Sequence, residues 1–158
     1  MGEELELPQG LVRIRVALET APGEPGPDHD WVWGEPLGSD RYRVESCAFF
    51  AYGISRDDVV RAGARADDGA PLLEHVEAKC GHRTLRVALD PAVELDAPEA
   101  RGLLDRLLDL GCTHEVMRPK IVAVDLPPEA DVLKVVALFE AGARDRWLVW
   151  EWADPRPC

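Results

Sequence analysis

Side chains that could bind an anion or move a proton gather, by strand parity, on one face of a sheet in the second half of the chain. The segments 83–89 and 120–126 have the composition of strands, and their apolar side chains should share one face. His82, Arg86 and Asp125 would then share the opposite face. Arginine recognises carboxylates and phosphates, and histidine is a common general acid or base. We expect an anion-binding pocket here or, more simply, an Arg86–Asp125 ion pair with His82 at a strand end.

Two more titratable residues are candidates for this face. Glu115 or His114 could join it from the neighbouring strand, whose parity is ambiguous. The sequence has no G-x-S-x-G, H-E-x-x-H, Walker or Rossmann motif. A hydrolytic centre also needs a nucleophile, a base and an orienting group in contact, which spacing does not establish. We therefore predict ligand-binding roles for these residues and no catalytic ones.

The four cysteines are far apart, without a CxxC pair. Cys80–His82 and Cys112–His114 are two C-x-H segments, and their thiols and imidazoles together would suit zinc. Structural zinc sites use tighter C-x(2–4)-C turns, so we predict no metal and no cofactor. The simplest expectation is free thiols on small buried side chains, with Cys158 as a loose thiol in the tail.

The elements that must position these residues follow from hydrophobic periodicity. An amphipathic helix is expected from a cap at Asp96 to Gly111, and a second one opens at 127–129 and stops at Gly142. Strands are expected at 83–89, 113–118, 120–126 and 147–152. The order βαββαβ is typical of a ferredoxin-like lobe.

The first half reads as short strands separated by tight turns. They are expected at 12–18, 31–33, 41–46, 57–60 and 72–78, with a hairpin turn at 66–70. This pattern predicts a small bent β-sheet or partial barrel. The fold class is therefore α+β, with residues 1–79 and 80–158 as two lobes of one compact unit.

Composition restricts the classes of partner. The 158 residues carry 18 Lys and Arg against 30 Asp and Glu, a net charge of −12. Such a chain is repelled by nucleic acids and anionic membranes and attracts cationic partners. The acidic N-terminus has no apolar signal region, and no apolar run approaches the roughly 18 residues of a membrane helix. We expect a cytoplasmic protein.

Three blocks in the middle of the chain occur in a recognisable order: F-F-A-Y-G at 49–53, D-V-V at 58–60 and G-H-x-T-x-R at 81–86. This pattern resembles a bacterial family of uncharacterised proteins, domain of unknown function 4265. The resemblance covers about residues 11–152, almost the entire chain. It supports the architecture and implies no reaction.

The resemblance also bears on single positions. It adds Arg83 to the candidate ligand-binding residues, beside His82 and Arg86. The family pattern usually has proline where this chain has Ala48, and glycine where it has Asp57. The second departure suggests a changed turn.

These observations favour a non-enzymatic binding or protein-interaction module. One form is an immunity or antagonist protein that binds a cationic partner, because charge complementarity speeds association. The alternative is a small accessory enzyme, or a sensor of anionic ligands, with a His, Arg and acid pocket between the lobes. The expected partner is a protein or a small anionic ligand, and an exposed edge strand would allow a homodimer.

Overall fold

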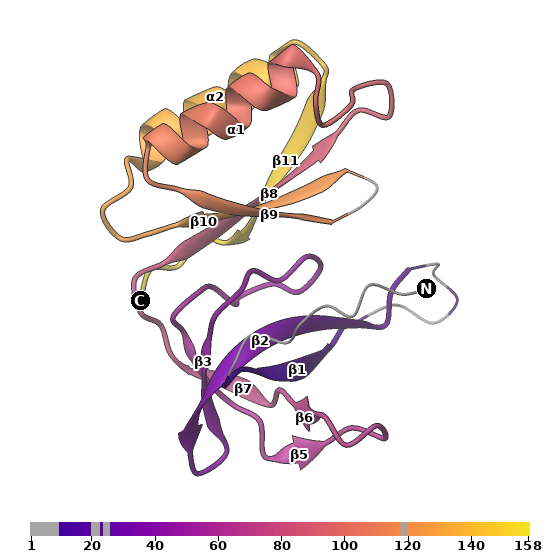
Figure 1. Ribbon diagram of the computed structural model, residues 1–158, viewed down its shortest axis with the longest axis vertical. Coiled ribbons are helices and arrows are strands. Elements are labelled where there is room, and N and C mark those ends of the chain that lie inside the picture. The colour runs from indigo at the N-terminus through magenta and orange to yellow at the C-terminus, as the bar shows by residue number, and fades with distance from the viewer. Residues whose placement is uncertain (1–9, 20–22, 24–25, 118–119) are drawn as a thin grey trace.

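The computed structural model describes residues 10–19, 23, 26–117 and 120–158. These residues form two sheets and two helices, so the chain is mixed α and β (Figure 1). The first sheet is curled, with the strand order β5-β6-β1-β2-β3-β4-β7. Its strands are β1 (Val12–Ala17), β2 (His29–Gly38), β3 (Arg41–Val44), β4 (Val59–Arg61), β5 (Ala64–Arg65), β6 (Pro71–Leu72) and β7 (His75–Ala78).

The expected single strand at 72–78 is wrong, because the backbone changes partners in its middle. β6 pairs with β1 and β5, whereas β7 pairs with β4. At the junction, Leu73 N donates to Arg15 O (2.9 Å) and Glu74 N donates to Arg61 O (2.8 Å). Two consecutive residues thus bond to β1 and to β4, which are separated by two strands in the sheet order, and the sheet is bent at this point.

The second sheet has the order β11-β8-β10-β9, with every neighbouring pair antiparallel. Both helices cover one of its faces, and the other face is turned toward the first sheet (Figure 1). Its core includes Leu85, Val87 and Val124 from the strands and Leu107 and Phe139 from the helices. The elements are β8 (Arg83–Leu89), α1 (Pro98–Asp109), β9 (Thr113–Met117), β10 (Ile121–Leu126), α2 (Val132–Arg144) and β11 (Leu148–Asp154).

The helices begin later than expected. Ala97 is the N-cap of α1, because Pro98 at the first helical position has a backbone already set for the helix, and Asp96 lies outside it. In α2, Asp131 is the N-cap, and its side chain accepts from Lys134 N at 3.2 Å. The segment 127–129 instead precedes the helix as a turn. Neither described helix is long and apolar enough to cross a membrane.

Gly142 does not end the second helix, which continues to Arg144. Its role is to permit close packing. A Cβ at this position would lie 2.5 Å from Leu148 Cδ2 and 3.1 Å from Trp147 Cε2. The missing side chain therefore lets the start of β11 pack directly onto α2.

The loop 45–58, between β3 and β4, covers the open face of the second sheet. Figure 1 shows this purple loop between the two sheets. Gly53 N donates to Ala153 O at 2.9 Å, a backbone bond from the loop to the end of β11. The candidate site is formed by side chains that contact each other across this face.

Candidate functional site

One buried carboxylate shapes the loop 45–58. Asp30 Oδ2 accepts hydrogen bonds from three successive backbone N–H groups, those of Phe49 (2.9 Å), Phe50 (2.8 Å) and Ala51 (3.0 Å). Asp30 falls on the buried parity of β2, next to Val32. The loop backbone is irregular, so its N–H groups have no carbonyl acceptors in a strand or helix. The Asp30 carboxylate accepts from them instead, and they are not left buried without a partner.

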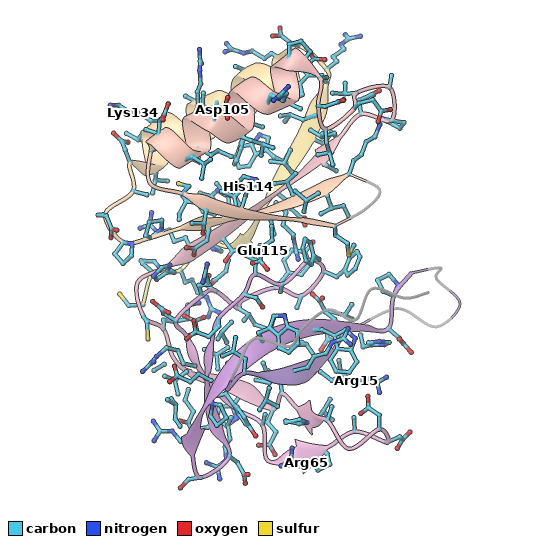
Figure 2. All side chains as sticks on the ribbon, in the orientation of Figure 1. Arg15, Arg65, Asp105, His114, Glu115 and Lys134 are labelled. Carbon is cyan, nitrogen blue, oxygen red and sulfur yellow. The ribbon has the colours of Figure 1, made fainter. Side chains whose placement is uncertain are left out.

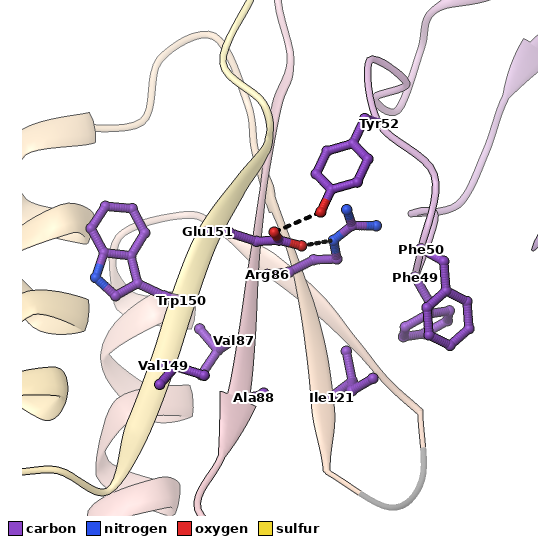
Figure 3. A pocket seen from close by; sticks show the side chains of 10 residues that line it. All are labelled: Phe49, Phe50, Tyr52, Arg86, Val87, Ala88, Ile121, Val149, Trp150 and Glu151. Atoms are coloured by element: carbon purple, nitrogen blue, oxygen red, sulfur yellow. Dashed lines mark hydrogen bonds and ion pairs between the residues drawn. The ribbon is translucent and has the colours of Figure 1, made fainter. Parts of the chain in front are cut away.

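Arg86 crosses from the second sheet to this loop. Its side chain is only 4 % exposed. Nε donates to Glu151 Oε1 at 3.1 Å and Nη1 donates to Ala51 O at 2.9 Å. The guanidinium carbon lies 4.5 Å from the centre of the Tyr52 ring, and the Tyr52 hydroxyl donates to Glu151 Oε2 at 2.7 Å. Figure 3 shows this arrangement, with one carboxylate joining the arginine and the tyrosine.

A cavity of about 270 Å³ adjoins this arginine. Figure 3 shows its lining, in which Phe49 and Phe50 lie across from the strands of the second sheet. The lining is apolar except for the Arg86–Glu151–Tyr52 cluster: Phe49, Phe50, Val87, Ala88, Ile121, Val149 and Trp150 complete it. Arg86 Nη2 is buried and has no hydrogen-bond partner among the described residues. An apolar cavity thus lies beside an arginine with unused donors.

The bond from Tyr52 to Glu151 has an electrostatic consequence. This hydrogen bond, with partial burial and the Glu151 charge, raises the pKa of Tyr52 above its usual range. The Arg86 charge acts in the opposite direction and is outweighed. Tyr52 is therefore a neutral hydrogen-bond donor at the mouth of the cavity.

His82 forms a second, separate cluster. Its Nδ1 lies 2.8 Å from Asp125 Oδ1, and its Nε2 lies 3.1 Å from Asp57 Oδ2. Burial raises the pKa of Asp125, and the contact with His82 opposes that shift. Asp57 comes from the loop 45–58 and Asp125 from β10, so the imidazole joins the loop to the second sheet.

The turn at Asp57 keeps a backbone that suits glycine. Its φ is +65°, in the left-handed region that aspartate tolerates better than most residues. Asp57 therefore places a carboxylate beside His82 on a turn whose backbone would suit glycine.

A third cluster, around Lys79, is buried and ties the loop to the end of β11. Lys79 Nζ pairs with the fully buried carboxylates of Asp58 and Asp154. Ser55 Oγ lies 2.7 Å from Thr84 Oγ1 and donates to Asp154 Oδ2 at 2.7 Å. Burial acts to raise the pKa of Asp154, but the bonds from Lys79 and Ser55 outweigh it and hold that pKa low. For Asp58, burial prevails and the pKa is raised.

Glu115 anchors the start of the loop. Its Oε2 accepts from Cys47 N at 2.5 Å. Burial, and then the Glu115 charge, raise the pKa of the Cys47 thiol well above its usual range. Burial also raises the pKa of Cys112, to about 11. These two thiols are therefore held protonated and inert.

The structure divides the six predicted ligand-binding residues into two groups. His82, Arg86, Asp125 and Glu115 lie on the face between the sheets. His114 pairs with Val124, on the side of the helices, and Figure 2 shows it across the sheet from Glu115. Arg83 pairs with Leu126 on that same side and lines a small cavity beside Pro127. All six lie in the described part of the chain, and among them only Arg86 lines the cavity of Figure 3.

The expected Arg86–Asp125 ion pair is replaced by two others. Ala123, and not Asp125, lies opposite Arg86 on β10, and Glu151 lies opposite it on β11. Arg86 therefore pairs with Glu151, and Asp125 pairs with His82. His82 and Arg86 are four positions apart, roughly 13 Å along an extended chain, so they serve different clusters.

Four residues of these clusters were not predicted from the sequence as site residues: Asp30, Tyr52, Lys79 and Glu151. Two of them had a usable signal. Asp30 occupies the apolar parity of its strand, and an acid at such a position predicts a buried hydrogen-bonding role. Glu151 stands between two tryptophans, on the parity that faces away from the helices. Among the described residues, no three His, Cys, Asp or Glu side chains gather as metal ligands.

Comparison with known proteins gives a fold and a family. The chain is similar to a solved structure titled "Novel crystal structure of a hypothetical protein from Neisseria gonorrhoeae", with a TM-score of 0.74 and 12 % sequence identity. The likeness covers 90 % of this chain and 94 % of that one, and at this identity it shows the fold alone. A search of curated proteins finds no match. The family described as "Domain of unknown function (DUF4265)" matches residues 30–150. The chain therefore belongs to the DUF4265 family.

Proposed function

We propose that this chain is a binding protein whose ligand is a small molecule with an apolar body and one carboxylate or similar anionic group. The ligand occupies the cavity of about 270 Å³ beside Arg86. The observation that carries the proposal is that Arg86 lines the cavity while its buried Nη2 has no hydrogen-bond partner among the described residues. Buried polar atoms of this kind are rare, and a ligand is one way to satisfy them.

The donors of the guanidinium support an anionic group. A guanidinium has five N–H donors, and Glu151 and Ala51 each accept from one of them. The remaining N–H groups include both on Nη2, which can hold a carboxylate oxygen. Tyr52 covers the guanidinium and is 65 % exposed, so its ring can move aside without disturbing the core.

The walls of the cavity support an apolar ligand body. Phe49 and Phe50 come from the loop, and Val149 and Ile121 come from the strands across from them. Small-molecule sites combine such walls with few, well-placed polar groups. Binding is favoured over catalysis because the cavity lining holds no histidine, and both nitrogens of His82 already face carboxylates.

We also infer that residues 80–158 form a ferredoxin-like lobe beside an all-β lobe. The strand order β11-β8-β10-β9 with both helices on one face supports this arrangement. In such a lobe the open face of the sheet is free for a ligand or a neighbouring lobe. Here the loop 45–58 covers that face, and the cavity lies at the edge of the covered area, between the loop and the strands.

The experiment is a titration with benzoate, a planar carboxylate with an apolar ring, followed by two-dimensional NMR of labelled protein. We expect saturable shifts at Arg86, Tyr52 and the amides of the loop. Arg86→Met should weaken binding at least tenfold, since it removes a charge-assisted contact. Arg43→Met, at an exposed arginine paired with Glu35, is the control and should bind as the unaltered protein does.

A second pair of variants avoids any cost to folding. Val149 is 68 % exposed at the cavity and Leu133 is 82 % exposed on α2. Val149→Glu places a negative charge at the cavity and should weaken benzoate binding several-fold, whereas Leu133→Glu should not. If benzoate and the longer octanoate both leave the cavity resonances unshifted at millimolar concentration, or if Val149→Glu binds as tightly as Leu133→Glu, the proposed site is wrong.

A cationic protein is the second candidate partner, and the net charge of −12 favours it. Native mass spectrometry of gently purified protein separates the two candidates. A small added mass that disappears in Arg86→Met supports the ligand site, and a polypeptide of defined mass supports the protein partner. A polypeptide that stays bound in Val149→Glu and Arg86→Met would place the interaction elsewhere on the chain.

A further inference from the structure

Two exposed cysteines, Cys80 and Cys158, lie at matching positions beside the second sheet. β11 runs antiparallel to β8, with Asp154 opposite Thr84. Counted onward from that pair, Pro157 corresponds to Gly81 and Cys158 corresponds to Cys80. In Figure 1 the C-terminal end lies beside the segment that connects β7 to β8.

A backbone hydrogen bond holds the segment after β11 beside the segment before β8. Gly81 N donates to Pro157 O at 2.6 Å. The pair Cys80 and Cys158 follows directly on the bonded pair. Disulfides join cysteines whose Cα atoms are about 4.4–6.8 Å apart, a range that the chain neighbours of a backbone hydrogen-bonded pair can reach.

We propose that Cys80 and Cys158 form a reversible disulfide by exchange with a low-molecular-weight disulfide such as oxidised glutathione. The thiolate of one cysteine attacks a sulfur of the small disulfide and releases one glutathione thiolate. The thiolate of the second cysteine then attacks the protein sulfur of the mixed disulfide and releases the other. The protein gives up two protons and two electrons, and the small disulfide becomes two thiols.

The position of the bond gives it a structural effect. Cys80 follows Lys79, and its N–H donates to Asp58 Oδ1 at 3.3 Å. Cys158 lies four residues after Asp154, which also pairs with Lys79. The disulfide would therefore join two segments that leave the same buried ion cluster, and it would close a loop around the whole second sheet. It would hold the segment after β11 against the segment before β8, next to the buried pairs of Lys79 with Asp58 and Asp154.

The experiment uses the full chain, incubated with oxidised or reduced glutathione, alkylated, and mapped by mass spectrometry without reduction. We expect a Cys80–Cys158 linked peptide whose yield does not depend on protein concentration. Oxidation should raise the melting temperature by roughly 10 °C, because the closed loop is long. Cys47 and Cys112 are buried and serve as internal controls that stay unmodified.

Two variants in the exposed tail separate this bond from general effects of oxidation. Cys158→Ser should lose both the linked peptide and the rise in melting temperature. Arg156→Ser, at a position whose side chain is 64 % exposed, should retain both. Oxidised protein that carries only glutathione adducts on these cysteines, or only links between molecules, would overturn the proposal. This result is independent of benzoate binding, so it can fail while the ligand site stands.

Discussion

Replacement of Asp30 by asparagine should loosen the loop that forms the cavity while the rest of the chain stays folded. Asp30 Oδ2 accepts from three loop N–H groups, and Oδ1 accepts from Trp31 N at 2.8 Å. An asparagine has one oxygen. With that oxygen turned to the three loop donors, its NH₂ group faces the Trp31 N–H, and a donor then meets a donor.

The magnitude follows from the four bonds. A hydrogen bond to a charged group contributes about 1 kcal/mol more than a neutral one, so the three retained bonds lose about 3 kcal/mol. The Trp31 donor left without an acceptor costs about 1–3 kcal/mol more. A neutral amide costs less to bury than a carboxylate, which offsets part of this loss of stability. We expect a net loss of about 3 kcal/mol in the free energy of unfolding, large for one substitution.

Urea denaturation measures this loss. With a slope of about 2 kcal/mol per molar urea, the midpoint should fall by about 1.5 M. Amide exchange at Phe49, Phe50 and Ala51 should accelerate about a hundredfold, since about 1.4 kcal/mol corresponds to a factor of ten. Asp28→Asn is the matched control, because Asp28 is 79 % exposed and its change should leave the midpoint where it was. A midpoint for Asp30→Asn equal to that of Asp28→Asn would refute the role assigned to this carboxylate.

Three further perturbations test the clusters on the same face. Lys79→Met leaves two buried carboxylates without their cation and should cost about 3–5 kcal/mol, measured by urea denaturation; a loss no larger than that of a surface lysine would contradict the buried pairing. Glu151→Gln removes the main cause of the raised pKa of Tyr52, so an ultraviolet titration of the tyrosines should show that pKa moving down toward 10, and an unchanged titration would place the hydroxyl elsewhere. Burial raises the pKa of Asp125, so this side chain binds a proton more tightly in the folded protein than in the unfolded chain. Protonation of Asp125 therefore stabilises the folded protein as the pH falls from its folded pKa toward the ordinary value of 3.8. Asp125→Asn should remove this contribution to the pH dependence of stability, measured as the difference between the urea midpoints at pH 7 and pH 4. The pKa of Asp154 is lowered, so its effect on stability has the opposite sign. Asp154 stabilises the folded chain while it is ionised, and this stabilisation is lost only when the pH falls below the ordinary pKa of an aspartate.

Local periodicity predicted the second sheet well because its cause is local. The bounds of β8 are those expected, and α1 ends just before Gly111, whose positive φ suits a helix terminus. The parity of β8 and β10 likewise separated the face of His82 and Arg86 from the core face. In strands and helices of this kind, the side on which a residue lies depends on its immediate neighbours in sequence.

Pairing between distant residues was not predictable in the same way. The parity of β8 shows that Arg86 faces away from the helices, but the register with β10 and β11 decides which acid it meets. That register placed Ala123 opposite Arg86 on one side and Glu151 on the other. A shift of two positions would keep every apolar residue in the core and change every ion pair. Burial of the core therefore does not determine the partners.

Local patterns of apolar and polar side chains were enough to predict the α and β character of the chain, its family, and the residues of β8 and β10, such as Arg86 and Asp125, that face away from the helices. The tertiary structure alone decided what those residues do. Arg86 and Glu151 are 65 positions apart, and Tyr52 and Glu151 are 99 apart. The cavity arises only where the loop held by Asp30 meets the strand that carries Arg86. Cys80 and Cys158, at opposite ends of the second sheet in sequence, become neighbours through one antiparallel register. Each of these contacts depends on chain folding that brings remote segments together, and no local pattern encodes which segments meet.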